Sequence, residues 1–170
     1  LAPQATSATP AGGGWLLDGA KSVVVGAPSA TRLIVSAATA GGASLFLVDP
    51  NASGVSRRVY PTIDGRKGCE LFLDNVQVSA DAVLGEIGNA LPALRYQQGR
   101  AIAAQCADAL GSMDEACKLT LDYLKTRKQF GVPIGSFQVL QHRMVEMVIC
   151  TEQARSLAIK AASTVDHATD

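Results

Sequence analysis

The stretch Leu124–Met144, LKTRKQFGVPIGSFQVLQHRM, separates two long helical patterns and so decides how the second half of the chain folds. On both sides of it, apolar residues recur every three or four positions, which predicts amphipathic helices. Gly131, Pro133 and Gly135 interrupt this period, and Ser136 is predicted to be the N-cap of the second helix. The sequence therefore predicts an antiparallel helical hairpin, with helices of about 30 residues each that would be on the order of 45 Å long.

Each predicted helix carries one apolar stripe. The first stripe is Leu110, Met113, Cys117, Leu121 and Leu124, and the second is Leu140, Met144, Met147, Ala154 and Ala158. Two helices alone do not cover such stripes, so we expect a helix bundle with further members. We therefore expect this chain to be a fragment, or a subunit that needs partners.

The first half of the chain has a different pattern. From Trp15 to about Val78, short apolar or alternating runs recur with Gly, Pro, Asp or Asn between them, as in a β-sandwich or barrel. Asp18-Gly19 predicts a hairpin turn, and the continuous runs Val23–Val25 and Leu45–Val48 predict central strands. The expected class is α+β, in which a small antiparallel β-barrel or sandwich precedes the helical hairpin. We expect a flexible lead-in at 1–12, a β domain at 13–88 and the helices at 89–170.

Composition excludes several classes of protein. Of 170 residues, 48% are apolar and 18% charged, which excludes a disordered chain. Lys+Arg and Asp+Glu are equal at 15 each, so neither a nucleic-acid partner nor an anionic membrane surface is expected. No apolar run reaches the roughly 20 residues of a membrane span, and no signal peptide is visible. We expect a cytoplasmic protein whose four dispersed cysteines (Cys69, Cys106, Cys117 and Cys150) are reduced core residues without metal.

Four segments together resemble the acyl-CoA dehydrogenase family over nearly all of residues 13 to 170. They are GWLLDGAKSVV, SLFLVD followed by GV, ELFLDNVQVSADAVLGEIGNAL, and TRKQFGVPIGSFQVLQHRMVEM. The last is the most specific, because it matches the Arg-x-Gln-Phe-Gly motif of the helical domain. The resemblance makes 13–88 the middle β domain and 89–170 the first two helices of the C-terminal bundle.

The resemblance implies an enzyme that binds FAD and oxidises the α,β C–C bond of an acyl-CoA thioester, as in fatty acid metabolism. A glutamate would remove the α-proton while the β-hydrogen leaves as hydride to flavin N5. Relatives form homo- or hetero-oligomers through the helical domain. By analogy, Arg127 and Gln129 would contact the FAD of a neighbouring subunit, Phe130 would lie beside it, and Gln138 would be near.

These residue types suit a flavin cofactor. A guanidinium matches pyrophosphate oxygens bidentately, and an amide donates and accepts hydrogen bonds. Phe130 would add an apolar wall. The alternative is a surface Arg127 and Gln129 beside a buried Phe130 that merely anchors the loop.

The sequence also departs from the family. The TEP-x-AGSD type of loop has no counterpart before the β domain, although PQATSATP stands in its place. The Trp and hydroxyl that relatives place near the isoalloxazine are Val23 and Val25 here. The catalytic glutamate of most relatives would lie beyond Asp170. The alternative location, Arg95–Gln105, contains no carboxylate, so no catalytic residue is assigned.

Two other interpretations of the function therefore stay open. One is a partner subunit without its own chemistry, which would lend FAD contacts and an interface to a catalytic chain. Another is a related flavin oxidase or monooxygenase. Within the family, SVVVG, VSRRVYPTIDG and KTRKQFGVPIG most resemble the bacterial pimeloyl-CoA dehydrogenase small-subunit type. We expect Arg100 to be an exposed helix residue and His142 to have no metal or nucleophile partner.

Overall fold

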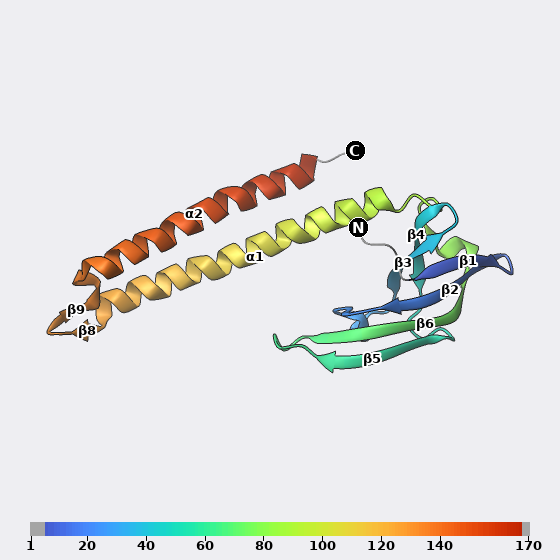
Figure 1. Cartoon of the computed structure of the whole chain (residues 1–170), viewed down its shortest axis with the longest axis horizontal. Coiled ribbons are helices and arrows are strands. Elements are labelled where there is room, and N and C mark those ends of the chain that lie inside the picture. Colours follow the sequence, from blue (N-terminus) through green and yellow to red (C-terminus); the bar gives the residue numbers. More distant parts are fainter. Residues whose placement is uncertain (1–5, 168–170) are drawn as a thin grey trace. The chain divides into compact units, whose positions relative to one another are not determined.

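The protein divides into two units, Leu1–Ala93 and Leu94–Asp170, in a computed structural model that describes residues 6–167. The first unit is a β domain and the second consists mainly of two long helices (Figure 1). The predicted α+β class is confirmed.

The strands of the first unit form one seven-stranded sheet. They are β1 (Ser7–Ala11), β2 (Gly14–Lys21), β3 (Leu33–Thr39), β4 (Gly42–Val48), β5 (Val55–Pro61), β6 (Lys67–Ser79) and β7 (Val83–Leu84), with 3-10 helices η1 (Ala27–Ser29) and η2 (Ala80–Ala82) between them. Their order is β5-β6-β2-β1-β3-β4-β7. Neighbours are antiparallel except β1 and β3, which pair in parallel at Ser7 and Ala38. The sheet is therefore mixed, where the sequence predicted an antiparallel one.

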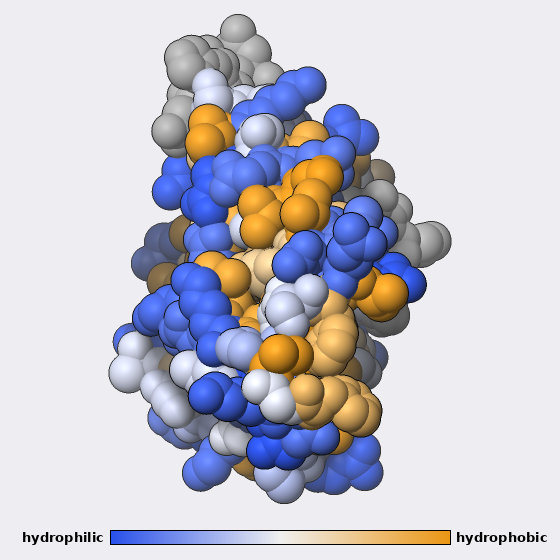
Figure 2. Space-filling model, turned by 90° about the vertical axis from the view of Figure 1, so that its left-hand side faces the viewer, coloured by the Kyte–Doolittle hydropathy of each residue, from blue (hydrophilic) through white to orange (hydrophobic). Residues whose placement is uncertain are grey.

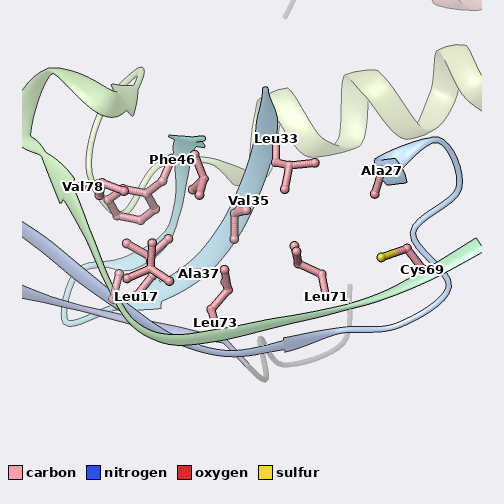
Figure 3. Packing of buried hydrophobic residues seen from close by; sticks show 13 residues of the cluster. Leu17, Ala27, Leu33, Val35, Ala37, Phe46, Cys69, Leu71, Leu73 and Val78 are labelled. Atoms are coloured by element: carbon pink, nitrogen blue, oxygen red, sulfur yellow. The ribbon is translucent and has the colours of Figure 1, made fainter. Parts of the chain in front are cut away.

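The core of the β unit is a single apolar cluster. Strand β3 alternates buried and more exposed positions, and its buried members Leu33, Val35 and Ala37 face Leu71 and Leu73 of β6 across the core (Figure 3). The same cluster includes Leu17 and Phe46, both fully buried. This period of two places every second side chain on the inner face, as the predicted sandwich requires.

The predicted flexible lead-in at 1–12 is wrong where the structure describes it. Ser7–Ala11 is strand β1, which pairs with β2 along its whole length through the two-residue turn Gly12–Gly13. Pro10 fits because the only β1–β3 pair is at Ser7, so at Pro10 the strand pairs with β2 alone. The part of the prediction that concerns residues 1–5 lies outside the described residues.

Two local predictions fail next to β6, while a third holds. Asp18-Gly19 lies inside β2 and not in a turn, because two residues of β6, Asp74 and Asn75, oppose Asp18 and absorb the irregularity. Val23–Val25 is not a strand, because β2 ends at Lys21. The run Leu45–Val48 is confirmed as part of β4.

The second unit is built from α1 (Leu91–Thr126, 36 residues) and α2 (Gln138–His167, 30 residues). Leu124, Thr151 and Ala158 are buried, and most other members of the predicted stripes are half-buried. Leu121 is the exception at 39% exposed; Thr120 is half-buried in its place. Polar contacts also join the helices, since Arg155 Nη2 donates to Asp114 Oδ1 at 2.6 Å.

The cysteines are free thiols, as predicted, but only Cys69 is a core residue. Cys106 and Cys150 are exposed on the helices, so the prediction that all four lie in a core is wrong. In residues 6–167 no helix combines the length and apolar character needed to cross a membrane.

Candidate functional site at the helical corner

A short corner joins α1 to α2 at one end of the helical hairpin (Figure 1). It consists of β8 (Lys128–Gln129), β9 (Val132–Pro133) and the 3-10 helix η3 (Ile134–Ser136). The Arg127 N–H still donates to the Tyr123 carbonyl at 2.9 Å, and the Arg127 carbonyl accepts from the Ile134 N–H at 2.8 Å. Arg127 is thus held by backbone hydrogen bonds on both sides, which leaves its side chain free to reach outward.

The tip of the corner is a two-residue β-hairpin turn. Phe130 and Gly131 lie between the paired strands and have φ of 56° and 82°. A positive φ at both central positions is what a type I′ turn requires. Glycine adopts this conformation readily, whereas a phenylalanine in it is uncommon and costs on the order of 1–3 kcal/mol. The two-residue turn places Phe130 at the tip of the β8–β9 hairpin.

The corner folds closely onto the end of α1. A Cβ at Gly135 would lie 2.9 Å from the Leu124 carbonyl oxygen, so no other residue fits there without a shift. Leu124 itself is only 9% exposed and anchors the same place. Because Gly135 has no side chain, η3 can pack directly against the end of α1, and this close approach allows a short connection between the two helices.

Phe130 is 92% exposed. Its ring meets Phe137 edge-on, with centroids 6.2 Å apart and planes at 82°. Phe137 is 38% exposed. The alternative in which Phe130 is a buried anchor of the loop is therefore wrong, and the pair offers an aromatic edge and face to a ligand or another chain.

The polar residues predicted for this corner are exposed as well. Within the described part of the chain, no carboxylate lies in ion-pair range of Arg127. Gln129 donates only to the neighbouring Lys128 carbonyl, at 2.9 Å, and Gln138 is the exposed first residue of α2. Figure 2, which views this end of the hairpin, shows apolar residues exposed among hydrophilic ones. Arg127, Gln129, Phe130 and Gln138 thus lie at the same corner, with the amino end of α2 adding partial positive charge.

The start of α2 differs from the prediction. Ser136 belongs to η3, and its hydroxyl donates to the Pro133 carbonyl at 2.7 Å, so it does not cap the helix. The Gln141 side-chain amide donates to the Gly135 carbonyl at 2.8 Å, which ties the first turn of α2 to η3. The 3-10 turn shifts the helix start to Gln138, because Leu140 and Gln141 both donate their N–H to Phe137.

The segment where relatives carry a Trp and a hydroxyl lies in the β unit. Val23 and Val25 are 59% and 49% exposed, and Val23 has φ of 53°. Glu70 of β6 accepts hydrogen bonds beside this segment, from the Tyr60 hydroxyl at 2.8 Å and the Val23 N–H at 3.3 Å. The position of Glu70 could not be predicted from the sequence, because nothing in an alternating strand indicates that its side chain accepts a hydrogen bond from a residue 47 positions away.

Glu70 and Tyr60 have shifted pKa values. The hydrogen bond from the Tyr60 hydroxyl, with smaller contributions from Ser22 and the Val23 N–H, lowers the pKa of Glu70. The same hydrogen bond, together with desolvation, raises the pKa of Tyr60. Near neutral pH Glu70 is therefore ionised and Tyr60 protonated. The hydrogen bond between them stabilises both of these protonation states.

Other candidates have ordinary surroundings. Arg100 is exposed, as predicted, and stacks over the Tyr96 ring at 5.6 Å from its centroid. It lines a shallow groove between the first half of α1 and the end of α2, together with small residues such as Ala104. No cluster of His, Cys, Asp or Glu suited to a metal ion occurs among the residues that the structure describes.

The sequence of this chain is similar to acyl-CoA dehydrogenases over nearly its whole length. Residues 1–76 match the family "Acyl-CoA dehydrogenase, middle domain", and residues 95–170 match "Acyl-CoA dehydrogenase, C-terminal domain". The chain is 32% identical over 161 residues to glutaryl-CoA dehydrogenase from Desulfococcus multivorans, in a match that covers 90% of this chain and 41% of that protein.

Solved structures give the same result. The complex of glutaryl-CoA dehydrogenase with glutaryl-CoA superposes with a TM-score of 0.87 at 31% identity, covering 95% of this chain and 43% of the other. Glutaryl-CoA dehydrogenase from Mycobacterium smegmatis with FADH2 gives 0.81 at 27% identity, covering 91% and 41%. This chain therefore spans less than half the length of the relatives it matches.

Proposed function

The chain belongs to the acyl-CoA dehydrogenase family, with a middle domain and part of the C-terminal domain, and from this premise we propose that it is part of an FAD-dependent oxidoreductase. The substrate would be an acyl-CoA thioester and the reaction the α,β-dehydrogenation of its acyl chain. FAD would supply the hydride acceptor. Glutaryl-CoA dehydrogenase, to which the chain is similar in sequence and fold, carries glutaryl-CoA in one solved structure and FADH2 in another.

The observation that carries the proposal is the exposed corner between the helices. Arg127 lacks a carboxylate partner among residues 6–167, and Phe130 is held 92% exposed in a left-handed conformation. A guanidinium would bind pyrophosphate oxygens, and Gln129 and Gln138 would add amide hydrogen bonds. Phe130 would lie against an apolar part of the cofactor or of the neighbouring subunit. These four residues form the proposed cofactor site of this chain.

We propose that the chain assembles into a homo- or hetero-oligomer through its helical unit. Large apolar side chains stay exposed on both helices, among them Leu119 at 60%, Leu157 at 67% and Ile159 at 65%. Exposed apolar surface of this extent is typical of interfaces. A cytoplasmic location, a role in fatty acid metabolism and the pimeloyl-CoA subtype remain proposals that rest on the sequence.

A second candidate function is a partner subunit that lends its corner to a flavin on a catalytic chain. The observation that favours it is the aliphatic pair Val23 and Val25 where relatives place a Trp and a hydroxyl. No group of this chain is assigned as the catalytic base. A flavin oxidase or monooxygenase would keep the same fold and cofactor with a different acceptor or substrate.

The test is a flavin spectrum of the complete protein that contains this sequence, followed by anaerobic addition of acyl-CoA. Bleaching of the oxidised flavin supports dehydrogenation. Bound flavin that never bleaches overturns it, and flavin that is retained only with a second chain favours the partner subunit.

Arg127→Ala tests the corner itself. We expect at least about tenfold weaker FAD retention with unchanged helicity, because one charge-assisted hydrogen-bonded group is lost. Arg143→Ala is the matched control, since Arg143 is an exposed arginine of α2 paired only with Glu146, at 2.9 Å. Equal FAD retention in the two variants would exclude Arg127 as a cofactor contact.

A further inference from the structure

The carboxylate of Glu70 gathers hydrogen bonds at the place where β2 ends. Its Oε1 accepts from the Tyr60 hydroxyl at 2.8 Å and from the Val23 N–H at 3.3 Å, and Ser22 contributes to lowering the pKa of the same carboxylate. Arg58 stands directly opposite Glu70 in the β5–β6 pair and adds positive charge nearby. Groups from β5 and from the segment after β2 therefore converge on one side chain of β6.

The backbone after β2 needs such a partner. From Gly19–Leu73 to Lys21–Leu71 the β2–β6 ladder keeps one register, and continuing that register would place Val23 opposite Cys69. Instead the Val24 N–H donates to the Cys69 carbonyl at 2.8 Å, so one extra residue has been inserted on the β2 side. That residue is Val23, and the ladder leaves its N–H unpaired until Glu70 accepts it.

Val23 is also an unusual residue for this position. Its φ of 53° lies in the left-handed region, which β-branched residues avoid at a cost on the order of 1–3 kcal/mol. Glycine is the ordinary choice at such an inserted position. A valine therefore persists here only where surrounding contacts hold the turn, and the hydrogen bond from the Val23 N–H to Glu70 is one such contact.

Glu70 is itself held in place. A Cβ at Gly68 would lie 2.7 Å from Cε2 of Tyr60, so the Tyr60 ring lies against the bare backbone of Gly68. This contact aims the Tyr60 hydroxyl at Glu70 across the β5–β6 pair. The arrangement is preorganised. Gly68 leaves room for the Tyr60 ring, and the protonated Tyr60 hydroxyl then donates to the Glu70 carboxylate in one position.

We propose that Glu70 is a positioning residue that locks the turn Ser22–Val25 and so sets the surface this segment presents to the flavin. The inference rests on the proposed function, since it assigns that segment to the cofactor side. With its N–H committed to Glu70, Val23 offers the flavin an apolar side chain and no backbone donor, and the exposed Val25 adds a second apolar group. Glu70 thus acts through the turn and does not touch the reacting atoms.

The experiment compares Glu70→Ala, Glu70→Gln and Tyr60→Phe with wild type in the complete protein. Glu86→Gln is the matched control, because Glu86 is an exposed glutamate of the same unit whose carboxylate accepts only from Asn89, at 3.4 Å. One readout is amide hydrogen exchange at Val23 and Val24, and the other is FAD affinity with the visible spectrum of bound flavin. Tyr60→Phe deletes one hydroxyl and keeps the comparison usable even if Glu70→Ala fails to fold.

We expect Glu70→Ala to speed exchange at Val23 and to weaken FAD binding, each by about tenfold, and to shift the flavin band. Glu70→Gln should recover part of both, since its amide oxygen still accepts hydrogen bonds. Faster exchange with unchanged flavin affinity and spectrum overturns the inference, as does unchanged exchange. A wild-type protein that binds no flavin overturns the proposed function and this inference together, whereas flavin binding equal in wild type, Glu70→Ala and Glu86→Gln overturns the inference alone.

Discussion

The β unit and the helical unit bury their apolar residues to very different degrees. The β unit has a closed core in which Leu17, Phe46 and Val48 are fully inaccessible to solvent. In the helical unit only Leu124, Thr151 and Ala158 are buried among the described residues, while side chains such as Leu119 and Ile159 remain more than half exposed. The β unit is therefore stabilised by its own core, and the helices depend on surfaces outside this chain.

Phe46→Ala should have the largest effect, because it removes the largest side chain of the β core. We expect a loss of about 3–5 kcal/mol in the free energy of unfolding of the β unit. Trp15, whose ring lies 5.6 Å from that of Phe46, is the single tryptophan and reports this transition by fluorescence. Phe72→Ala is the control, since Phe72 is on β6 but 42% exposed. Equal losses in the two variants would mean that the β unit lacks the closed core described above.

Leu124→Ala and Leu119→Ala compare a buried and an exposed leucine of the same helix. For this chain alone we expect about 2–3 kcal/mol lost at Leu124 and less than about 0.5 kcal/mol at Leu119, which is 60% exposed. In the complete, assembled protein Leu119→Ala should become costly, because a partner would then cover it. Thermal unfolding followed by far-UV circular dichroism measures both. A small Leu119 effect in both forms would contradict an interface at this position.

Asp114→Asn should have a smaller effect on the contact between the helices. Arg155 donates to Asp114 at 2.6 Å, but their side chains are 38% and 45% exposed. Solvent screening limits such a pair to about 1 kcal/mol or less. We expect a small loss of stability that shrinks as salt is added. Glu115→Gln, which breaks only the pair with Lys118 within α1, is the control; an equal loss there would mean that the contact does not join the helices.

Much of this fold could be predicted from the sequence, because the spacing of apolar residues that identifies a helix or a strand is set by residues a few positions apart. The helical stripes follow from residue spacing alone, and the corner was predicted from Gly131, Pro133 and Gly135. These features depend on neighbours within a few residues.

The failures involve contacts between distant strands. Asp18-Gly19 has the composition of a turn, but the pairing of Asp18 with Ser7 of β1 and of Gly19 with Leu73 of β6 keeps it in a strand. The run Val23–Val25 has strand propensity, but one inserted residue and the carboxylate of Glu70 turn the chain there. Pairing register is a tertiary property that overrides local preference. The role of Glu70 was invisible for the same reason.

Asp64→Asn should have the smallest effect, confined to a hairpin loop and to a defined pH range. Hydrogen bonds from Thr62, and then from Arg66, lower the pKa of Asp64 from 3.8 to about 2. Because the folded pKa lies below the unfolded one, the stabilisation is fully present above about pH 4 and is lost as the pH falls through 2. We therefore expect Asp64→Asn to destabilise the β unit slightly at neutral pH, with the difference from wild type vanishing toward pH 2. Urea unfolding at a series of pH values measures this difference. Thr62→Val removes the hydrogen bond that lowers the pKa of Asp64 most, so it should narrow the pH range over which the stabilisation is lost. If the stability difference between wild type and Asp64→Asn instead grew as the pH fell, the loop would stabilise the protonated form of Asp64, and the prediction would be wrong.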